Sequence, residues 1–86
     1  MAFHSFKALI HRERFFVAEC AELALSAQGR SVEEALAGLR IATEEYLATL
    51  GDNVESTLRA LDARPITHEQ RGKGTIMRRY RVEIPA

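Results

Sequence analysis

The chain has a single cysteine, two prolines and no tryptophan among its 86 residues, and its formal net charge is zero. One cysteine excludes an intramolecular disulfide and a zinc site built from cysteines, and it fits a reducing compartment. The balanced charge gives no overall electrostatic attraction to nucleic acid or to a membrane. No apolar run has the length of a membrane span and no signal-peptide core is present, so we expect a cytoplasmic protein without membrane contact.

The usual spacings of catalytic and metal-binding residues are also missing. The three histidines are too widely separated for a metal-binding pair on one helix: His4, His11 and His68. Cys20 lies between Glu19 and Glu22, whose charges would raise the pKa of its thiol rather than activate it. Glu33 and Glu34 begin a predicted helix, where the helix dipole explains acidic residues better than a magnesium site does. We therefore expect no catalytic residue, no metal site and no cofactor, and predict that the protein is not an enzyme.

The strongest pattern in the chain is one amphipathic helix between Ser31 and Gly51. Ser31 with Glu34 three residues later forms a capping box, and Gly51 is suited to the helix end. The apolar stripe recurs at helical spacing and consists of Val32, Ala35, Leu36, Leu39, Ala42, Tyr46, Leu47 and Leu50. Ile41 lies about opposite this stripe. A helix with one such stripe needs a sheet to cover.

Segments that alternate between apolar and polar residues supply that sheet. The predicted strands are Phe3–His11, Phe15–Cys20, Ala24–Gln28 and, near the C-terminus, Thr75–Ile84. A shorter helix with Val54, Leu58 and Leu61 on one side precedes Pro65, and Thr67–Gly74 is a predicted loop. The order β-β-β-α-α-β predicts an α+β fold, with a small, mostly antiparallel sheet and the long helix packed on one face.

The last predicted strand and the loop before it carry a run of basic residues that contains no acid: Arg71, Lys73, Arg78, Arg79 and Arg81. Three interpretations are open. The charges can protect an edge strand from aggregation, contact a nucleic-acid backbone around Tyr80, or meet the acidic rim of a protein partner.

Four segments together resemble the HicB-like antitoxin family. They are Phe6-Lys7-Ala8-Leu9-Ile10, Phe16-Val17-Ala18-Glu19-Cys20-Ala21-Glu22-Leu23, Gln28-Gly29-Arg30-Ser31-Val32-Glu33-Glu34-Ala35-Leu36, and Tyr46-Leu47. Family members show a strand, a Y/F-V-A-E-x-P-E-L segment, a helix entry that ends in E-E-A, and a helix that ends near Y-L. The resemblance covers about residues 5–50.

This resemblance implies a partial RNase H-like or double-stranded-RNA-binding-domain-like fold without nuclease carboxylates. It also implies a dimer or tetramer that neutralises a HicA-type mRNA-cleaving toxin. Ala21 and Ala24 replace the prolines usual in the family, and residues 52–86 are too few for a helix-turn-helix. We therefore expect one HicB-like domain over residues 1–86, with no separate DNA-binding domain.

The leading hypothesis is thus a non-enzymatic HicB-like binding protein that forms homo-oligomers. Its alternatives are a nucleic-acid-binding module that uses the basic C-terminal strand, and a stand-alone homo-oligomeric HicB relative of unknown role. The sheet is apolar on both faces and one helix covers only one of them, so the other face needs a partner. The candidate contact residues are Leu9, Phe15, Phe16, Ile41, Arg78, Arg79 and Arg81.

Overall fold

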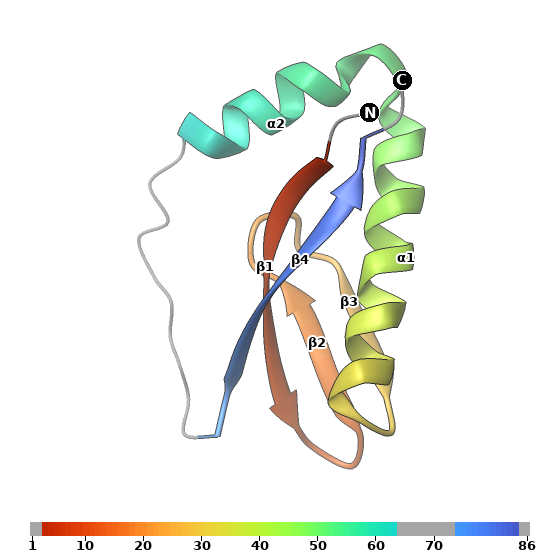
Figure 1. Ribbon diagram of the computed structural model, residues 1–86, viewed down its shortest axis with the longest axis vertical. Helices are drawn as coiled ribbons and strands as arrows, with labels where there is room; N and C mark the ends of the chain where they lie inside the picture. The colour runs from red at the N-terminus through yellow and green to blue at the C-terminus, as the bar shows by residue number, and fades with distance from the viewer. Residues whose placement is uncertain (1–2, 64–73, 85–86) are drawn as a thin grey trace.

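Four strands and two α-helices make up the computed structural model of the chain, which describes residues 3–63 and 74–84. The elements are β1 (Phe3–Arg12), β2 (Phe16–Cys20), β3 (Ser26–Gly29), α1 (Val32–Leu50), a 3₁₀ turn (Gly51–Asn53), α2 (Val54–Ala63) and β4 (Ile76–Glu83). The predicted α+β fold is confirmed, because the strands form one antiparallel sheet and α1 packs along one face of it (Figure 1). Of the predicted loop Thr67–Gly74, only Gly74 lies within the described residues.

The sheet has the strand order β3-β2-β1-β4, so the last strand of the chain pairs with the first. In β1, Phe6 is opposite Tyr80 of β4, and Ala8 is opposite Cys20 of β2. Only residues 8–12 of β1 pair with β2, whereas residues 3–10 pair with β4. β1 and β2 are therefore the two inner strands, and β3 and β4 form the two edges.

Helix α1 begins and ends where the sequence predicts. The Ser31 side chain accepts a hydrogen bond of 3.1 Å from the Glu34 N–H, which is one half of the predicted capping box. At the other end, Gly51 has φ 55°, a region that favours glycine. The fully buried helix residues recur every fourth position: Ala35, Leu39, Thr43 and Leu47. Ile41 is 54% exposed on the opposite side, as the pattern predicts.

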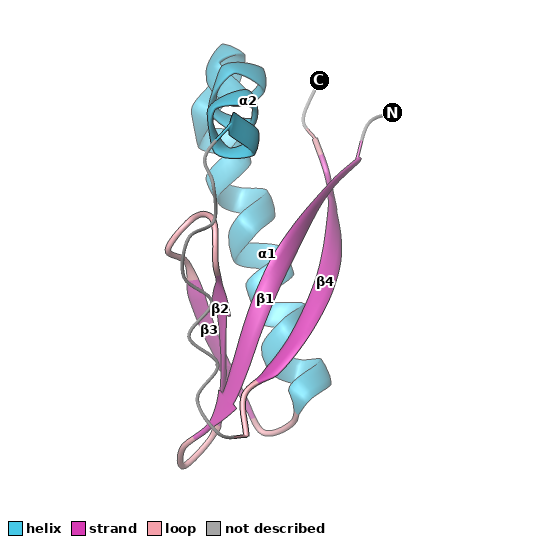
Figure 2. Ribbon diagram, turned by 90° about the vertical axis from the view of Figure 1, so that its left-hand side faces the viewer, coloured by secondary structure: helices cyan, strands magenta, loops and turns pink. Residues whose placement is uncertain are grey.

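Beyond Gly51, a short 3₁₀ turn redirects the chain into α2, which runs across one end of the molecule (Figures 1 and 2). Val54 and Leu58 of α2 are buried and belong to the same hydrophobic core as α1. Among the described residues, no helix combines the length and apolar character that crossing a bilayer requires.

The core lies between α1 and the even-numbered side chains of β1. Phe6, Ala8 and Ile10 are completely buried there, as the alternation in the sequence predicts. Ala18 and Cys20 of β2 and Tyr80 and Val82 of β4 complete this helix-facing side. We call the opposite side of the sheet the outer face; it carries the odd-numbered residues of β1 and β4.

The third strand starts two residues later than predicted, at Ser26 rather than Ala24. Ala24 has φ 56°, a left-handed conformation that a strand residue does not adopt and that costs an alanine about 1–2 kcal/mol. The Glu22 carboxylate closes this loop onto the sheet by accepting the Lys7 N–H at 3.1 and 3.3 Å. It thus satisfies a β1 backbone group at a position that β2 is too short to reach.

Small residues bring α1 close to β3. Gly29 is buried at the end of β3, and a Cβ atom there would lie 2.5 Å from the backbone nitrogen of Ala35 and 2.8 Å from the carbonyl carbon of Glu34. Further along α1, a Cβ on Gly38 would lie 3.2 Å from the Ala27 side chain. The helix therefore lies nearer to β3 than larger side chains would allow.

We expect Gly29→Ala to lower the free energy of unfolding by about 2–4 kcal/mol, because the new methyl group would overlap backbone atoms that cannot move separately. Urea denaturation followed by circular dichroism measures this loss. Gly38→Ala is the matched control. It should stay within about 1 kcal/mol of the parent chain, since the gain in helix propensity offsets a mild contact. Equal stability of the two variants would contradict this account of the β3–α1 approach.

Candidate interaction surface

Strand β4 is an edge strand whose outer backbone groups can be identified from the register. Lys7 of β1 directs its backbone towards β2, because its N–H is accepted by Glu22 and its carbonyl accepts the Ala21 N–H at 2.9 Å. In an antiparallel pair this direction alternates, so Phe6 and Ala8 face β4, and their partners Tyr80 and Arg78 face β1. The N–H and C=O groups of Arg79 and Arg81 therefore point away from the sheet. No described strand pairs with that edge.

The three arginines of β4 do not form a single patch. Arg78 alternates onto the helix-facing side, whereas Arg79 and Arg81 lie on the outer face, and all three are exposed. The Arg81 guanidinium lies over the Phe3 ring, 5.5 Å from its centroid. Of the remaining predicted basic residues, Arg71 and Lys73 lie outside the described residues.

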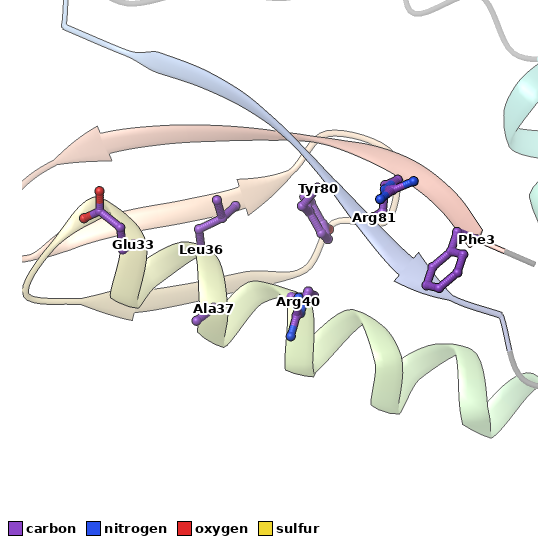
Figure 3. Close-up of a pocket in the computed structure, with 7 residues that line it drawn as sticks. All are labelled: Phe3, Glu33, Leu36, Ala37, Arg40, Tyr80 and Arg81. Carbon is purple, nitrogen blue, oxygen red and sulfur yellow. The ribbon is translucent and has the colours of Figure 1, made fainter.

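A cleft of about 500 Å³ runs between α1 and β4 (Figure 3). Its lining residues are Phe3, Glu33, Leu36, Ala37, Arg40, Tyr80 and Arg81. In the close-up, Leu36 points from α1 towards the sheet, and Arg40 lies on the turn of α1 nearest to Tyr80 of β4 (Figure 3). Arg40 is also within 3.8 Å of Glu44 one helical turn later, in an exposed ion pair.

The cleft has a physical cause in the packing of the helix. Gly29, Ala27 and Gly38 let α1 lie close to β3, at one edge of the sheet. A helix about 10 Å wide that lies towards that edge covers β4, at the other edge, only in part, over Tyr80 and Val82. The contacts of α1 are densest with β3 and sparser with each of the other three strands. The open cleft beside β4 follows from the small residues on the opposite side.

A buried polar cluster anchors Tyr80 at the floor of the cleft. The Thr43 hydroxyl donates to the Leu39 carbonyl at 2.8 Å, so in its 2.8 Å contact with the Tyr80 hydroxyl it accepts. Thr43 is completely buried although it is polar, and it lies outside the apolar stripe predicted for this helix. Its neighbours four residues away on either side, Leu39 and Leu47, are the signal that predicts its burial.

Burial raises the pKa values of the Tyr80 phenol and of the neighbouring Cys20 thiol. Desolvation is the main cause for the Cys20 thiol, which is 3% exposed, with a smaller contribution from the nearby Glu22 carboxylate. Desolvation also raises the pKa of the Tyr80 phenol, and a hydrogen bond with the Cys20 side chain adds to this shift. Both groups are therefore neutral at physiological pH, and neither resembles an activated nucleophile.

The predicted apolar contact residues lie in separate places. Leu9 is half-buried on the outer face, Phe15 is 49% exposed in the turn between β1 and β2, and Ile41 lies on the far side of α1. Phe16 packs against the core from the helix-facing side, with the Arg12 guanidinium 5.7 Å from its ring centroid. The structure therefore does not unite these residues into one surface.

The remaining candidates for chemistry are dispersed. The His4 ring packs on Phe6 with centroids 4.7 Å apart, and His11 lies 3.9 Å from the Glu13 carboxylate. His68 lies outside the described residues. Within residues 3–63 and 74–84, no three His, Cys, Asp or Glu side chains are grouped so that they could hold a metal ion.

Comparison with known proteins gives no match: no family model, no curated protein and no solved structure is similar to this chain at a significant level.

The neutral Cys20–Tyr80 pair predicts how stability depends on pH. Because folding raises both pKa values, the unfolded chain loses these protons at lower pH than the folded one. Stability from the pair is therefore fully present below the ordinary thiol pKa of 9.0 and is lost as the pH rises above it. Acidification should not affect this contribution. We expect the free energy of unfolding to fall above pH 9 by up to about 1.4 kcal/mol per pH unit for each group.

Urea denaturation at intervals from neutral to alkaline pH tests this expectation. The double variant Cys20→Ala/Tyr80→Phe lacks both protons and should show a flatter decline than the parent chain. Parallel declines in the two proteins would show that other groups cause the alkaline loss.

Proposed function

We propose that this chain is a non-enzymatic protein-binding domain that captures a partner at the β4 edge and the adjoining cleft. The observation that supports the proposal best is the combination of an open edge strand, exposed arginines and a cleft of mixed apolar and charged lining within one small area. Edge strands of natural proteins are usually short, covered or interrupted. β4 is eight residues long and carries no proline, so it is well suited to binding.

The HicB resemblance suggests what the partner is. Under this proposal the chain is a HicB-like domain of the cytoplasm that sequesters a HicA-type mRNA-cleaving toxin. The order β-β-β-α over residues 5–50, with the helix capped at Ser31, supports this part of the proposal. The proposal assigns no DNA-binding role to residues 52–86.

Nucleic acid is the alternative partner, since Arg79 and Arg81 are exposed on the outer face. The charge around them argues for protein. Glu83 shares the outer face of β4 with both arginines, and Glu19 of β2 lies on that same face opposite Leu9. These carboxylates repel the evenly spaced phosphates of a nucleic acid, whereas a protein segment can place its acidic side chains opposite the arginines alone.

Co-expression with the product of the neighbouring gene tests the proposal. We expect a stable complex in which Arg79→Glu/Arg81→Glu weakens the affinity at least about tenfold, because two attractive charges become repulsive. Titration calorimetry measures the affinity. Arg59→Glu is the matched control, because Arg59 is exposed on α2 away from β4, and it should bind like the parent chain. A neighbour without toxicity that forms no complex would remove the antitoxin proposal.

Self-association is the second part of the proposal, and Ile41 is the residue that favours it. A half-exposed isoleucine on the back of α1 is a suitable contact between copies. Light scattering at micromolar concentration should give a multiple of the 9.7 kDa chain mass. Ile41→Glu should lower that mass, whereas Ala60→Glu, at an exposed position on α2, should not. A monomeric parent chain would contradict this part of the proposal.

A further inference from the structure

We propose that the β4 edge binds an extended, acidic segment of the partner as a fifth strand of the sheet, in which acidic and apolar side chains alternate. This inference rests on the proposed protein-binding function and specifies what the partner must present. Three features of the described residues lead to it: the backbone of β4, the alternation of its side chains, and the distribution of its charge.

The backbone argument concerns donors and acceptors together. The outward-pointing N–H and C=O groups of Arg79 and Arg81 alternate along the edge. An added strand, parallel or antiparallel, could form hydrogen bonds with both kinds of group. A polypeptide supplies both kinds of group. The phosphate groups of a nucleic acid offer acceptors to the N–H groups but no donor for the carbonyl oxygens. The edge as a whole therefore matches an extended peptide better than a nucleic-acid strand.

The side chains of an added strand would continue the two faces of the sheet. A residue opposite Tyr80 would lie on the helix-facing side and enter the cleft, which Leu36 and Arg40 also line. An apolar side chain of moderate size would pack there on Leu36 and on the aliphatic part of Arg40. Residues opposite Arg79 and Arg81 would lie on the outer face. There, cross-strand pairing with arginine favours aspartate or glutamate. The expected core of the segment is acidic, apolar, acidic.

A second copy of this chain is a poorer occupant of the same edge. Antiparallel pairing of two β4 strands brings arginines from the two copies together in the registers centred on residues 79 to 81, although a register centred on Val82 would pair Arg81 with Glu83. A register centred on Tyr80 places Arg79 opposite Arg81 of the other copy, and one centred on Arg79 or Arg81 places that arginine opposite itself. Like charges that are directly opposite destabilise a strand pair. The arginines thus disfavour β4-to-β4 pairing while they attract an acidic strand.

The test uses a capped synthetic nonapeptide of alternating glutamate and valine, titrated into the ¹⁵N-labelled chain. We expect the amide signals of β4 and of residues 36 and 37 to shift, and the Arg79 and Arg81 amides to exchange more slowly with solvent. A peptide of alternating lysine and valine should bind at least about tenfold more weakly. Two further Glu–Val peptides carry N-methyl groups, one at its odd-numbered and one at its even-numbered residues. The peptide whose N-methyl groups replace the N–H groups that face β4 should also bind at least about tenfold more weakly than the unmethylated peptide.

Two variants at position 79 separate the contribution of the backbone hydrogen bond from that of the side-chain charge. Arg79→Ala removes only the side-chain charge, whereas Arg79→Pro also removes an N–H that points away from β1, so the β1–β4 ladder is preserved. We expect Arg79→Pro to weaken peptide binding clearly more than Arg79→Ala does. Circular dichroism checks that both variants fold. If Arg79→Pro does not fold, the N-methylated peptides decide the question alone.

Several results would overturn the inference. These are equal binding of the acidic and basic peptides, signal shifts confined to other elements, tighter binding of a single-stranded oligouridine to the same amides, and protection of the β4 amides by self-association without peptide.

The partner from the co-expression experiment separates the two proposals. If it binds the parent chain, Arg79→Ala and Arg79→Pro equally, strand addition is wrong and the protein-binding function stands. If the acidic peptide binds and the neighbouring gene product does not, strand addition stands and the antitoxin function is wrong.

Discussion

The packing of α1 on the inward side chains of β1 is the contact on which this small fold depends. Phe6, Ala8 and Ile10 lose all solvent contact beneath one helix, and the burial of such apolar surface is the dominant favourable term in folding. A chain of this size has room for only one such core. The position of every other element, including the edge strand and the cleft, follows from how this helix lies on the sheet.

That position is asymmetric, and the asymmetry connects packing with function. At the β3 side, glycine and alanine let the helix approach the backbone closely. At the β4 side, the larger Tyr80 reaches under α1 to Thr43, and the space beyond it stays open as the cleft. The same shift of the helix that gives close packing at one edge therefore leaves a binding surface at the other. The proposed partner strand would occupy the side of the sheet that α1 leaves uncovered.

Most of the fold could be predicted from the sequence because its signals are local. The cap at Ser31, the glycine at position 51 and the alternation in β1 each act over a few residues, and each predicted element is present to within about two residues. The third strand begins later than predicted because Ala24 has a positive φ angle, which the presence of an alanine does not predict. The burial of Thr43 was not predicted, because a hydroxyl group is expected at the surface unless its hydrogen-bond partners inside the core are known.

The candidate site was less predictable, since it depends on contacts between distant parts of the chain. The sequence pointed to Arg79 and Arg81 on an edge strand, and β4 is indeed an edge. It could not show that Leu36, Ala37 and Phe3 would lie beside that strand, because the β1–β4 pairing joins residues more than sixty positions apart. The scattering of Phe15, Phe16 and Ile41 has the same origin: apolar character is visible in a sequence, but shared location is not.

The pairing of Phe3 with Glu83 has a consequence for how this unit can be combined with others. The first and last described strands start and finish side by side, at the end of the sheet where α2 crosses (Figure 1). A polypeptide that enters the unit therefore leaves it next to its point of entry. Such a module can be inserted into a surface loop of a larger host protein without separating the two halves of that loop, and its binding edge would stay accessible along the side of the graft.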